Sequence, residues 1–225
     1  MVGPPLTREQ AHAMRQRSVV KDKLIMEPHI AIMLDLETMG KQQDCVIAAI
    51  AAARCDLAAP EFVLLGEPFY DVVDLNNQPG RRFEPETVRW WLQQNDTARQ
   101  IFSKQINPTP LSNVLIRLSQ YLKTNSFVTV WSKGADFDIT ILNHAYAKRK
   151  LNFYQPWDYR QQQCFRTIVN LHDPNKTVEP AWPAENKHNA MHDAVHQLHW
   201  LYNIWQREGG FDDIIYKDTI RGGTV

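Results

Sequence analysis

Residues 30–38 of the chain read IAIMLDLET, an apolar run that ends in two acidic residues two positions apart. The apolar part, residues 30–34, has the length of a buried strand rather than a helix. Successive side chains of a strand point to opposite faces, so Asp35 and Glu37 would leave the same face directly after the core segment. A rigid strand can present paired carboxylates to a hard cation in this way, although acidic residues at a strand end also occur as plain surface residues.

The order of the remaining elements predicts an α/β protein. Residues 45–55 and 61–73 favour two more strands, which together with the first would form an antiparallel meander. Further elements are expected in the order of a helix from Pro85 through Trp90, a helix from Thr109-Pro110 through Tyr121, a strand at residues 127–131, a helix at 136–150, a loop at 173–187 and an amphipathic helix at 189–207 that stops at Gly209-Gly210.

Length and composition indicate one globular domain. The chain has 225 residues, of which 44% are hydrophobic and 22% charged. No apolar run approaches the roughly 20 residues of a membrane span, and the N-terminus lacks the apolar core of a signal peptide, so we expect a cytoplasmic protein that makes no membrane contact. We expect residues 1–27 to be a mobile extension, residues 28–208 the folded domain and residues 209–225 a C-terminal tail.

Cysteine use and net charge exclude two classes of protein. Cys45, Cys55 and Cys164 are an odd number without CxxC spacing, which argues against a disulfide framework or a structural zinc site and indicates core residues. Basic and acidic residues number 25 each, so the chain lacks the basic excess of a protein that coats duplex DNA. A nucleic-acid substrate is still compatible, because bound cations would add positive charge where phosphate must lie.

Two further acidic segments could complete a site with the first strand. In GADFD, residues 134–138, Asp136 suits a helix cap, and Asp138 is the better candidate for a carboxylate beside the first strand. In HNAMHD, residues 188–193, Asp193 would lie at the edge of the apolar stripe of the last helix. His188 and Asp193 would be about 140° apart within one helix, so they can share a site only if His188 precedes the first turn.

Three histidines on the last helix allow two interpretations. His192, His196 and His199 cluster on the side of the helix opposite its apolar stripe. A solvated histidine face is the favoured interpretation. The alternative is a transition-metal site formed by His188, His192 and His196.

Taken together, these motifs resemble those of the DEDDh exonuclease superfamily, the DnaQ-like nucleases. An Asp-x-Glu strand, an Asp after Phe at the start of a central helix and a His-x4-Asp at a late helix occur in this order. The segments DLETMG, RWWLQQ, WSKGADFDITIL and HNAMHDAVHQ further resemble the bacteriophage exonuclease A type and related bacterial exoribonucleases. The resemblance covers about residues 29–205.

The resemblance implies a fold, a cofactor and a reaction. The fold is α/β and ribonuclease H-like, with a five-stranded mixed sheet flanked by helices and the Asp-x-Glu strand at its centre. Two Mg²⁺ or Mn²⁺ ions would be held by Asp35, Glu37, Asp138 and Asp193, and His188 would be the general base. The reaction would be 3'→5' exonucleolytic hydrolysis of single-stranded nucleic acid to nucleoside 5'-monophosphates, with DNA slightly favoured over RNA.

Substrate contacts are less well determined by the sequence. Thr38 and Met39 fall where the resemblance implies contact with the terminal nucleotide. Neighbouring Trp90 and Trp91 point about 100° apart on a helix, so at most one would stack on a base, and core positions for both are favoured. Arg166 could hold a phosphate, orient a carboxylate or form a structural ion pair.

One departure from the family pattern and two rival functions stay open. Where many relatives place Asn or His ahead of the second Asp, this chain has Ser132, Lys133 and Gly134. The partner is expected to be the 3' end of single-stranded DNA or RNA, and an exoribonuclease that trims RNA is the rival within enzymes. An inactive nucleic-acid-binding module on the same fold is the rival outside them. Dimers occur among similar proteins, so a homodimer is one expectation.

Overall fold

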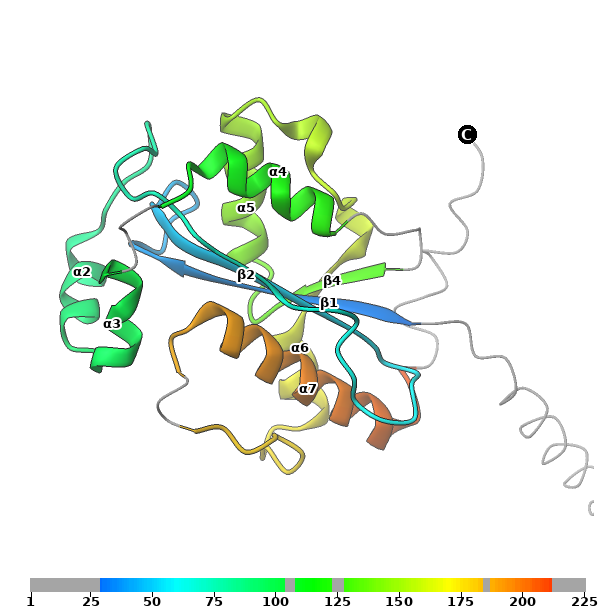
Figure 1. The fold of residues 1–225 in the computed structure, drawn as a ribbon. Helices are drawn as coiled ribbons and strands as arrows, with labels where there is room; N and C mark the ends of the chain where they lie inside the picture. The colour runs from blue at the N-terminus through cyan, green and yellow to red at the C-terminus, as the bar shows by residue number, and fades with distance from the viewer. Residues whose placement is uncertain (1–28, 104–107, 123–127, 184–186, 212–225) are drawn as a thin grey trace, which may run out of the picture.

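A five-stranded mixed sheet lies at the centre of the protein, with helices on both faces (Figure 1). The structure is a computed structural model that describes residues 29–103, 108–122, 128–183 and 187–211. The extension expected at residues 1–27 and the tail beyond residue 211 lie outside the described residues. The strands are β1 (Ile30–Thr38), β2 (Ile47–Asp56), β3 (Phe69–Val72), β4 (Val128–Ser132) and β5 (Gln162–Cys164).

The order and pairing of the strands confirm the expected sheet. The spatial order is β3-β2-β1-β4-β5, which places β1 at the centre. β1 pairs with β2 and β2 with β3 in antiparallel fashion, as predicted for the meander. β1 and β4 are parallel, as are β4 and β5.

Helices cover both faces of this sheet and one of its ends (Figure 1). α4 (Leu111–Tyr121) and α5 (Asp138–Lys148) lie on one face, and α6 (Phe165–His172) and α7 (Ala190–Glu208) lie on the other. α2 (Pro85–Leu92) and α3 (Asp96–Ser103) stand together at the end where β1 terminates. Two short 3₁₀ helices, η1 (Asn152–Tyr154) and η2 (Tyr159–Gln161), lead from α5 into β5.

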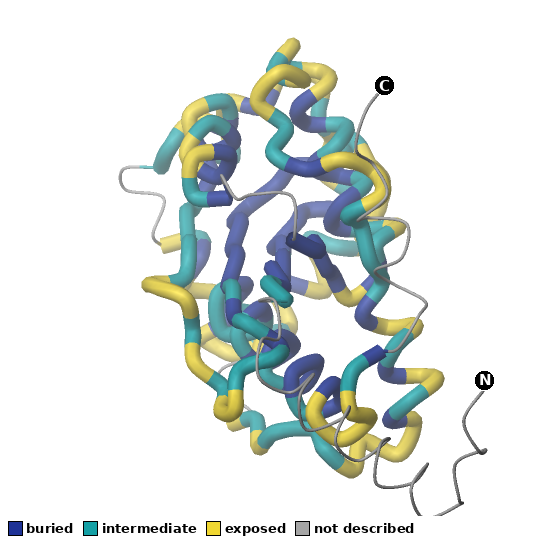
Figure 2. The backbone as a smooth tube through the Cα atoms, turned by 90° about the vertical axis from the view of Figure 1, so that its right-hand side faces the viewer, coloured by how far each residue is buried: buried dark blue, intermediate teal, exposed yellow. Residues whose placement is uncertain are grey.

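The alternation of side chains along β1 decides which face carries the acidic residues. Ile32 and Leu34 belong to the apolar cluster under α4 and α5, whereas Met33 belongs to the cluster under α7. Most residues of β1 are buried, and Figure 2 shows buried backbone running through the middle of the molecule. Asp35 and Glu37 share the parity of Met33, so they point to the α7 side of the sheet.

The structure corrects the extent of several expected elements. The strand expected at residues 61–73 is only Phe69–Val72, preceded by a single bridge between Cys55 and Leu64. Gly66 has a positive φ of 84° and Pro68 lacks an N–H, which interrupts regular pairing there. β5, α3 and α6 were not located from the sequence, although five strands were expected.

Two local predictions were wrong. Asp136 does not cap α5: its side chain is exposed, Phe137 is the N-cap residue and the cap has no side-chain hydrogen bond. Cys45 and Cys55 are buried as expected, but Cys164 is only partly buried. The end of α7 follows the prediction, because Gly209 ends it with a left-handed φ of 75°. Among the described residues, no helix has the length and apolar character needed to cross a membrane.

Candidate active site

Carboxylates from two elements meet at the end of the central strand. Ligand oxygens of Asp35, Glu37 and Asp193 all lie within 4.8 Å of one another. Asp35 and Glu37 come from β1, and Asp193 comes from the first turn of α7, which packs on the same face of the sheet. Within the described part of the chain, these three side chains form the group that could hold a metal ion.

Asp138, the fourth predicted carboxylate, is attached to the backbone of β1. The parallel pairing of β1 with β4 ends at Leu34 and Ser132. The next amide of β1 on the β4 side, that of Leu36, therefore has no partner in β4. Asp138, the first residue of α5, accepts a hydrogen bond from this amide, Leu36 N to Asp138 Oδ1 at 3.2 Å. The side chain is only 5% exposed, and the bond holds it beside the acidic pair.

His188 lies where the geometry of α7 requires it. It occupies the turn before Asn189, the N-cap residue of α7, and its backbone N–H donates to Asp193 Oδ2 at 2.9 Å. Its φ of 63° is in the left-handed region, which costs a non-glycine residue of order 1 kcal/mol unless its surroundings hold it there. The predicted placement of His188 ahead of the helix is therefore confirmed, and the residue is joined directly to one of the carboxylates.

Burial and mutual repulsion make the cluster electrostatically unfavourable without a cation. Burial, followed by repulsion from the neighbouring carboxylates, raises the pKa of Asp35 and of Glu37 well above the ordinary values. Burial also raises the pKa of Asp138 to about 7, against the opposing hydrogen bond from Leu36. Burial raises the pKa of Asp193 too, opposed first by the hydrogen bond from His188. A divalent cation would remove the cause of this repulsion.

Gln197 belongs to the site although it was not a candidate in the sequence. Its Nε2 donates to Asp35 Oδ1 at 2.9 Å, and the residue is only 5% exposed. Gln197 follows Asp193 by four residues on α7, so both side chains lie on the same side of the helix. That spacing, in HDAVHQ, is the signal that could have identified it.

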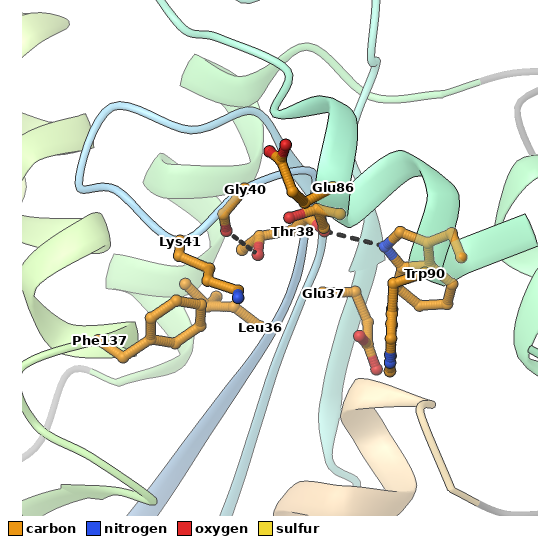
Figure 3. A pocket seen from close by; sticks show the side chains of 10 residues that line it. Leu36, Glu37, Thr38, Gly40, Lys41, Glu86, Trp90 and Phe137 are labelled. Atoms are coloured by element: carbon orange, nitrogen blue, oxygen red, sulfur yellow. Dashed lines mark hydrogen bonds between the residues drawn. The ribbon is translucent and has the colours of Figure 1, made fainter. Parts of the chain in front are cut away.

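A pocket of about 460 Å³ opens beside Glu37, and we call it the Trp90 pocket (Figure 3). Its lining includes Glu37, Thr38, Lys41, Glu86, Trp90 and Phe137. Figure 3 shows Glu37 and Trp90 on one side of the pocket and Phe137 and Lys41 on the other.

Trp91 forms part of the wall of this pocket and fixes the end of β1. It is 2% exposed and donates from Nε1 to Thr38 O at 2.9 Å. Trp90 is 39% exposed, with its ring edge-on to His188 at a centroid distance of 4.8 Å. Core positions for both tryptophans were therefore a wrong prediction, because the two rings leave α2 in different directions and only Trp91 points inward.

Met39 does not line the Trp90 pocket. Its side chain is buried, its N–H donates to Val46 O and its carbonyl accepts from Glu84 N, both at 2.8 Å. Of the two residues expected next to the terminal nucleotide, Thr38 is thus the one that faces the pocket.

A second pocket, of about 320 Å³, lies beside Asp35 and Asp193, and we call it the Trp182 pocket. Its lining includes Asp35, Lys133, Lys176, Trp182, Asp193 and Gln197. The two pockets have no lining residue in common, so the carboxylate cluster lies between them.

The histidines of α7 do not form a solvated face. His196 is only 6% exposed, stacks on Trp182 with centroids 4.3 Å apart and has Nε2 3.1 Å from Pro180 O. His199 stacks on Phe62 at 4.2 Å. The segment after α6 covers His196, and the segment between β2 and β3 covers His199, which helical spacing alone could not show.

Arg166 makes a backbone contact. Its guanidinium donates to Lys133 O at 2.8 Å, which holds the turn between β4 and α5. Gly134 in this turn has a φ of 123°, and a Cβ at this position would lie 3.3 Å from the Arg166 side chain. Arg166 forms no ion pair within 4.0 Å among the described residues, but its charge opposes the burial that raises the pKa of Asp138, in line with the expectation that it acts on a carboxylate. The phosphate contact stays a prediction.

This fold and this acidic cluster define a class, the DEDDh or DnaQ-like 3'→5' exonucleases. The chain belongs to the family described as the 3'-5' exoribonuclease Rv2179c-like domain, which matches residues 30–205. No curated protein matches the sequence.

Solved structures of exonuclease I share the fold. The zinc-bound complex of Escherichia coli exonuclease I with single-stranded DNA has a TM-score of 0.57 at 14% identity, covering 81% of this chain and 42% of that chain. Exonuclease I from Methylocaldum szegediense has a TM-score of 0.58 at 14% identity, with coverages of 80% and 41%. The present chain thus spans about two fifths of the length of these proteins.

Proposed function

We propose that this protein removes nucleotides one at a time from the 3' end of single-stranded nucleic acid, releasing nucleoside 5'-monophosphates. The observation that supports this most strongly is the meeting of Asp35, Glu37 and Asp193 within 4.8 Å, with Asp138 bonded to the strand between the first two. Family membership supplies the reaction class, and the residues supply the proposed mechanism.

The donor set fits two Mg²⁺ or Mn²⁺ ions. Carboxylate oxygens are the ligands that these hard cations prefer. Burial raises the pKa values of Asp35, Glu37 and Asp138, and the hydrogen bonds and charges of the described residues around them do not offset it. When bound, a pair of ions supplies an activated water and stabilises the leaving 3' oxygen.

His188 is proposed as the general base. It lies next to Asp193 in the chain's fold and lines the cleft beside the carboxylates. An imidazole titrates near neutral pH and can accept the proton of the attacking water, which the carboxylates, when committed to cations, cannot do.

The Trp90 pocket is proposed to hold the 3'-terminal nucleoside. It adjoins Glu37, its volume of about 460 Å³ suits a nucleoside, and Trp90 presents an exposed ring on which a base can stack. The turn after β1 is held by a hydrogen bond from the Thr38 hydroxyl to Gly40 O at 2.7 Å, and both residues line the pocket.

RNA is proposed as the better substrate. The match to a family described as exoribonucleases covers most of the chain, whereas likeness to the DNA-bound exonuclease I structures shows the fold alone. The slight preference for DNA suggested by the sequence motifs has less support than RNA, and it stays a prediction.

The deciding experiment is degradation of 5'-labelled single-stranded RNA and DNA of matched sequence with Mg²⁺, Mn²⁺ or EDTA. We expect a ladder that shortens from the 3' end, is abolished by EDTA and forms faster on RNA. His188→Ala is expected to lower the rate by about 10²- to 10⁴-fold, the usual contribution of a general base. Asp138→Ala is expected to lower it at least about 10³-fold through loss of metal binding.

Asp136→Ala is the matched control, because Asp136 is exposed, lies two residues from Asp138 and makes no contact with the cluster. It should retain wild-type activity. Binding of either polymer without any cleavage would favour the inactive module, and cleavage that survives Asp138→Ala would contradict the metal site.

A further inference from the structure

We propose that the Trp182 pocket binds the nucleotide on the 5' side of the scissile phosphate, with Lys133 holding the 5' phosphate of that nucleotide and Trp182 stacking on its base. This inference rests on the proposed function and adds a second subsite to it. It also assigns a role to Lys133, one of the three residues at which this chain departs from many relatives.

The Trp182 pocket is assigned to this nucleotide because of the path that the nucleic-acid strand must take past the carboxylates. Glu37 lines the Trp90 pocket, whereas Asp35 and Asp193 line the Trp182 pocket. If the terminal nucleoside occupies the first pocket, its 5' phosphate lies at the carboxylates, and the next nucleotide must continue on their other side. The Trp182 pocket is on that side.

Two exposed lysines of the pocket lining, Lys133 and Lys187, form no ion pair within 4.0 Å among the described residues, and we assign the phosphate to Lys133 because its backbone is held in a fixed turn. Lys176 also lines the pocket, but its Nζ is 3.3 Å from Glu179 Oε2. Within the described residues, no carboxylate lies within 4.0 Å of the Lys133 ammonium, and the side chain is exposed. Lys133 lines this pocket together with Asp35 and Asp193.

The backbone of Lys133 is fixed before any ligand arrives. Arg166 donates to its carbonyl at 2.8 Å, and the positive φ of Gly134 sets the turn that follows. A lysine on a fixed turn loses less freedom on binding a phosphate than one on an open loop.

The indole of Trp182 is partly exposed and stacks on His196, another residue of the pocket lining. One side of the indole stacks on His196 at 4.3 Å with planes at 29°, and His196 is in turn 3.1 Å from Pro180 O. An aromatic ring supported on one side can accept a base on the other without regard to sequence.

The wall of the pocket also contains a buried acceptor whose hydrogen-bonding capacity is unused. Gln197 Nε2 donates to Asp35, but among the described residues Gln197 Oε1 has no hydrogen-bond partner. The residue is 5% exposed, and leaving a buried polar atom without a hydrogen-bond partner is unfavourable. A bound water or a sugar hydroxyl at this position would supply the missing donor.

The phosphate contact is tested by a double-substitution cycle that combines Lys133→Ala in the protein with the loss of one phosphate charge in the substrate. The substrate is an octauridylate whose second linkage from the 3' end is either a phosphate or an uncharged methylphosphonate, with the adjacent 2'-hydroxyl removed in both. Removal of the terminal nucleotide is measured in single turnover. We expect the methylphosphonate to slow the wild-type reaction about tenfold. It should slow the Lys133→Ala reaction less than about twofold, because the variant has already lost the charged contact.

The base contact is tested with the same oligonucleotide lacking the second base from the 3' end. Loss of that base should slow wild type about 5- to 100-fold, the range of base–aromatic stacking, and should not slow Trp182→Ala further. Trp182→Phe should restore sensitivity to the missing base, which separates stacking from support of His196.

A binding measurement provides a readout independent of turnover. On an Asp35→Asn background without metal, adding Lys133→Ala should weaken binding of the labelled octauridylate and reduce the salt slope by about one ion. Lys148→Ala, an exposed lysine at the end of α5, is the control and should change neither quantity.

The outcomes separate this inference from the proposed function. No hydrolysis by wild type would contradict the proposed function. Hydrolysis with equal methylphosphonate effects in wild type and Lys133→Ala would overturn the phosphate contact, and equal effects of the missing base in wild type and Trp182→Ala would overturn the base contact.

Discussion

The indole of Trp90 lies edge-on to the imidazole of His188, with ring centroids 4.8 Å apart and planes at 87°. Trp90 lines one pocket and His188 the other, so this contact bridges the two sides of the carboxylate cluster. A base that enters against Trp90 therefore touches the residue that supports the proposed general base, and substrate binding and base positioning are physically joined.

This contact predicts a distinctive kinetic effect of Trp90→Ala. Loss of stacking should lower kcat/KM by about 5- to 100-fold, and kcat should fall as well because His188 loses its aromatic support. Trp90→Phe keeps a ring and should recover most of kcat. The measurement is steady-state kinetics on a single-stranded oligonucleotide, with Leu92→Ala, an exposed residue on the same helix, as the control. An increase in KM with unchanged kcat would show that Trp90 binds substrate without positioning His188.

Gln197 is predicted to act on metal affinity through Asp35. Gln197→Leu removes the donor at 2.9 Å from Asp35 Oδ1 without a large change in volume. Partners that orient a metal ligand typically contribute 10- to 100-fold in metal affinity or activity, so we expect a loss of about that size. Titration of the protein with Mn²⁺ by calorimetry tests this, and Gln206→Leu, farther along α7, is the control. Unchanged Mn²⁺ affinity would limit Gln197 to a packing role.

The acidic cluster predicts how the stability of the metal-free protein depends on pH. The pKa of Asp138 is raised to about 7 by burial, and those of Asp35 and Glu37 are raised well above their ordinary values by burial and repulsion. Stability from protonation of these groups is fully present below the unfolded pKa of about 4 and is lost as the pH rises through the folded values. For each such group that is deprotonated in the unfolded state and still protonated in the folded state, the free energy of unfolding falls by about 1.4 kcal/mol per pH unit.

The measurement is the free energy of unfolding of wild type and of Asp138→Asn, from chemical denaturation between pH 5 and pH 8 with EDTA, and the difference between the two proteins is compared across this range. His196, whose pKa is lowered by burial, works in the opposite direction at the acidic end and is common to both proteins. We expect the variant to lose less stability toward pH 8, and Mn²⁺ to stabilise wild type more at pH 8 than at pH 5. Parallel curves for the two proteins would refute the assignment.

The local parts of the fold could be read from the sequence, and the reason is visible in β1. Its apolar run, its period-two acidic pair and the helix starts at Pro85 and Asn189 are signals within a few residues. The five proposed catalytic residues were each identifiable because they occur in short motifs at the ends of such elements. The prediction that these residues meet in one site came from the order of the motifs along the chain, and no single motif indicated it.

The elements that were missed lack such signals. β5 is a three-residue strand, QQC, held in place by pairing with β4 and not by its own hydrophobicity. The burial of His196 depends on a segment that returns over α7 from residues 173–183, a contact that periodicity cannot reveal. Both failures involve interactions between segments distant in sequence.

The anchor of that returning segment is Asp173, which leads to a final prediction. Its carboxylate is 1% exposed and accepts from Thr177 N and Oγ1 at 2.8 and 2.6 Å and from Trp200 Nε1 at 2.8 Å. Arg207 adds an ion pair at 3.2 Å. Burial alone would raise the pKa of Asp173, but the hydrogen bonds outweigh it and the pKa lies below its ordinary value.

Asp173→Ala should therefore lower the free energy of unfolding by roughly 3 kcal/mol, because buried donors are left unpaired. Since the group has a depressed pKa, its contribution is present above about pH 4 and lost as the pH falls further, so wild type and variant should converge in acid. Urea denaturation at pH 7 and pH 3 tests both statements, with exposed Asp96→Ala as the control. A difference that persists unchanged at pH 3 would mean that Asp173 acts through packing rather than through its charge.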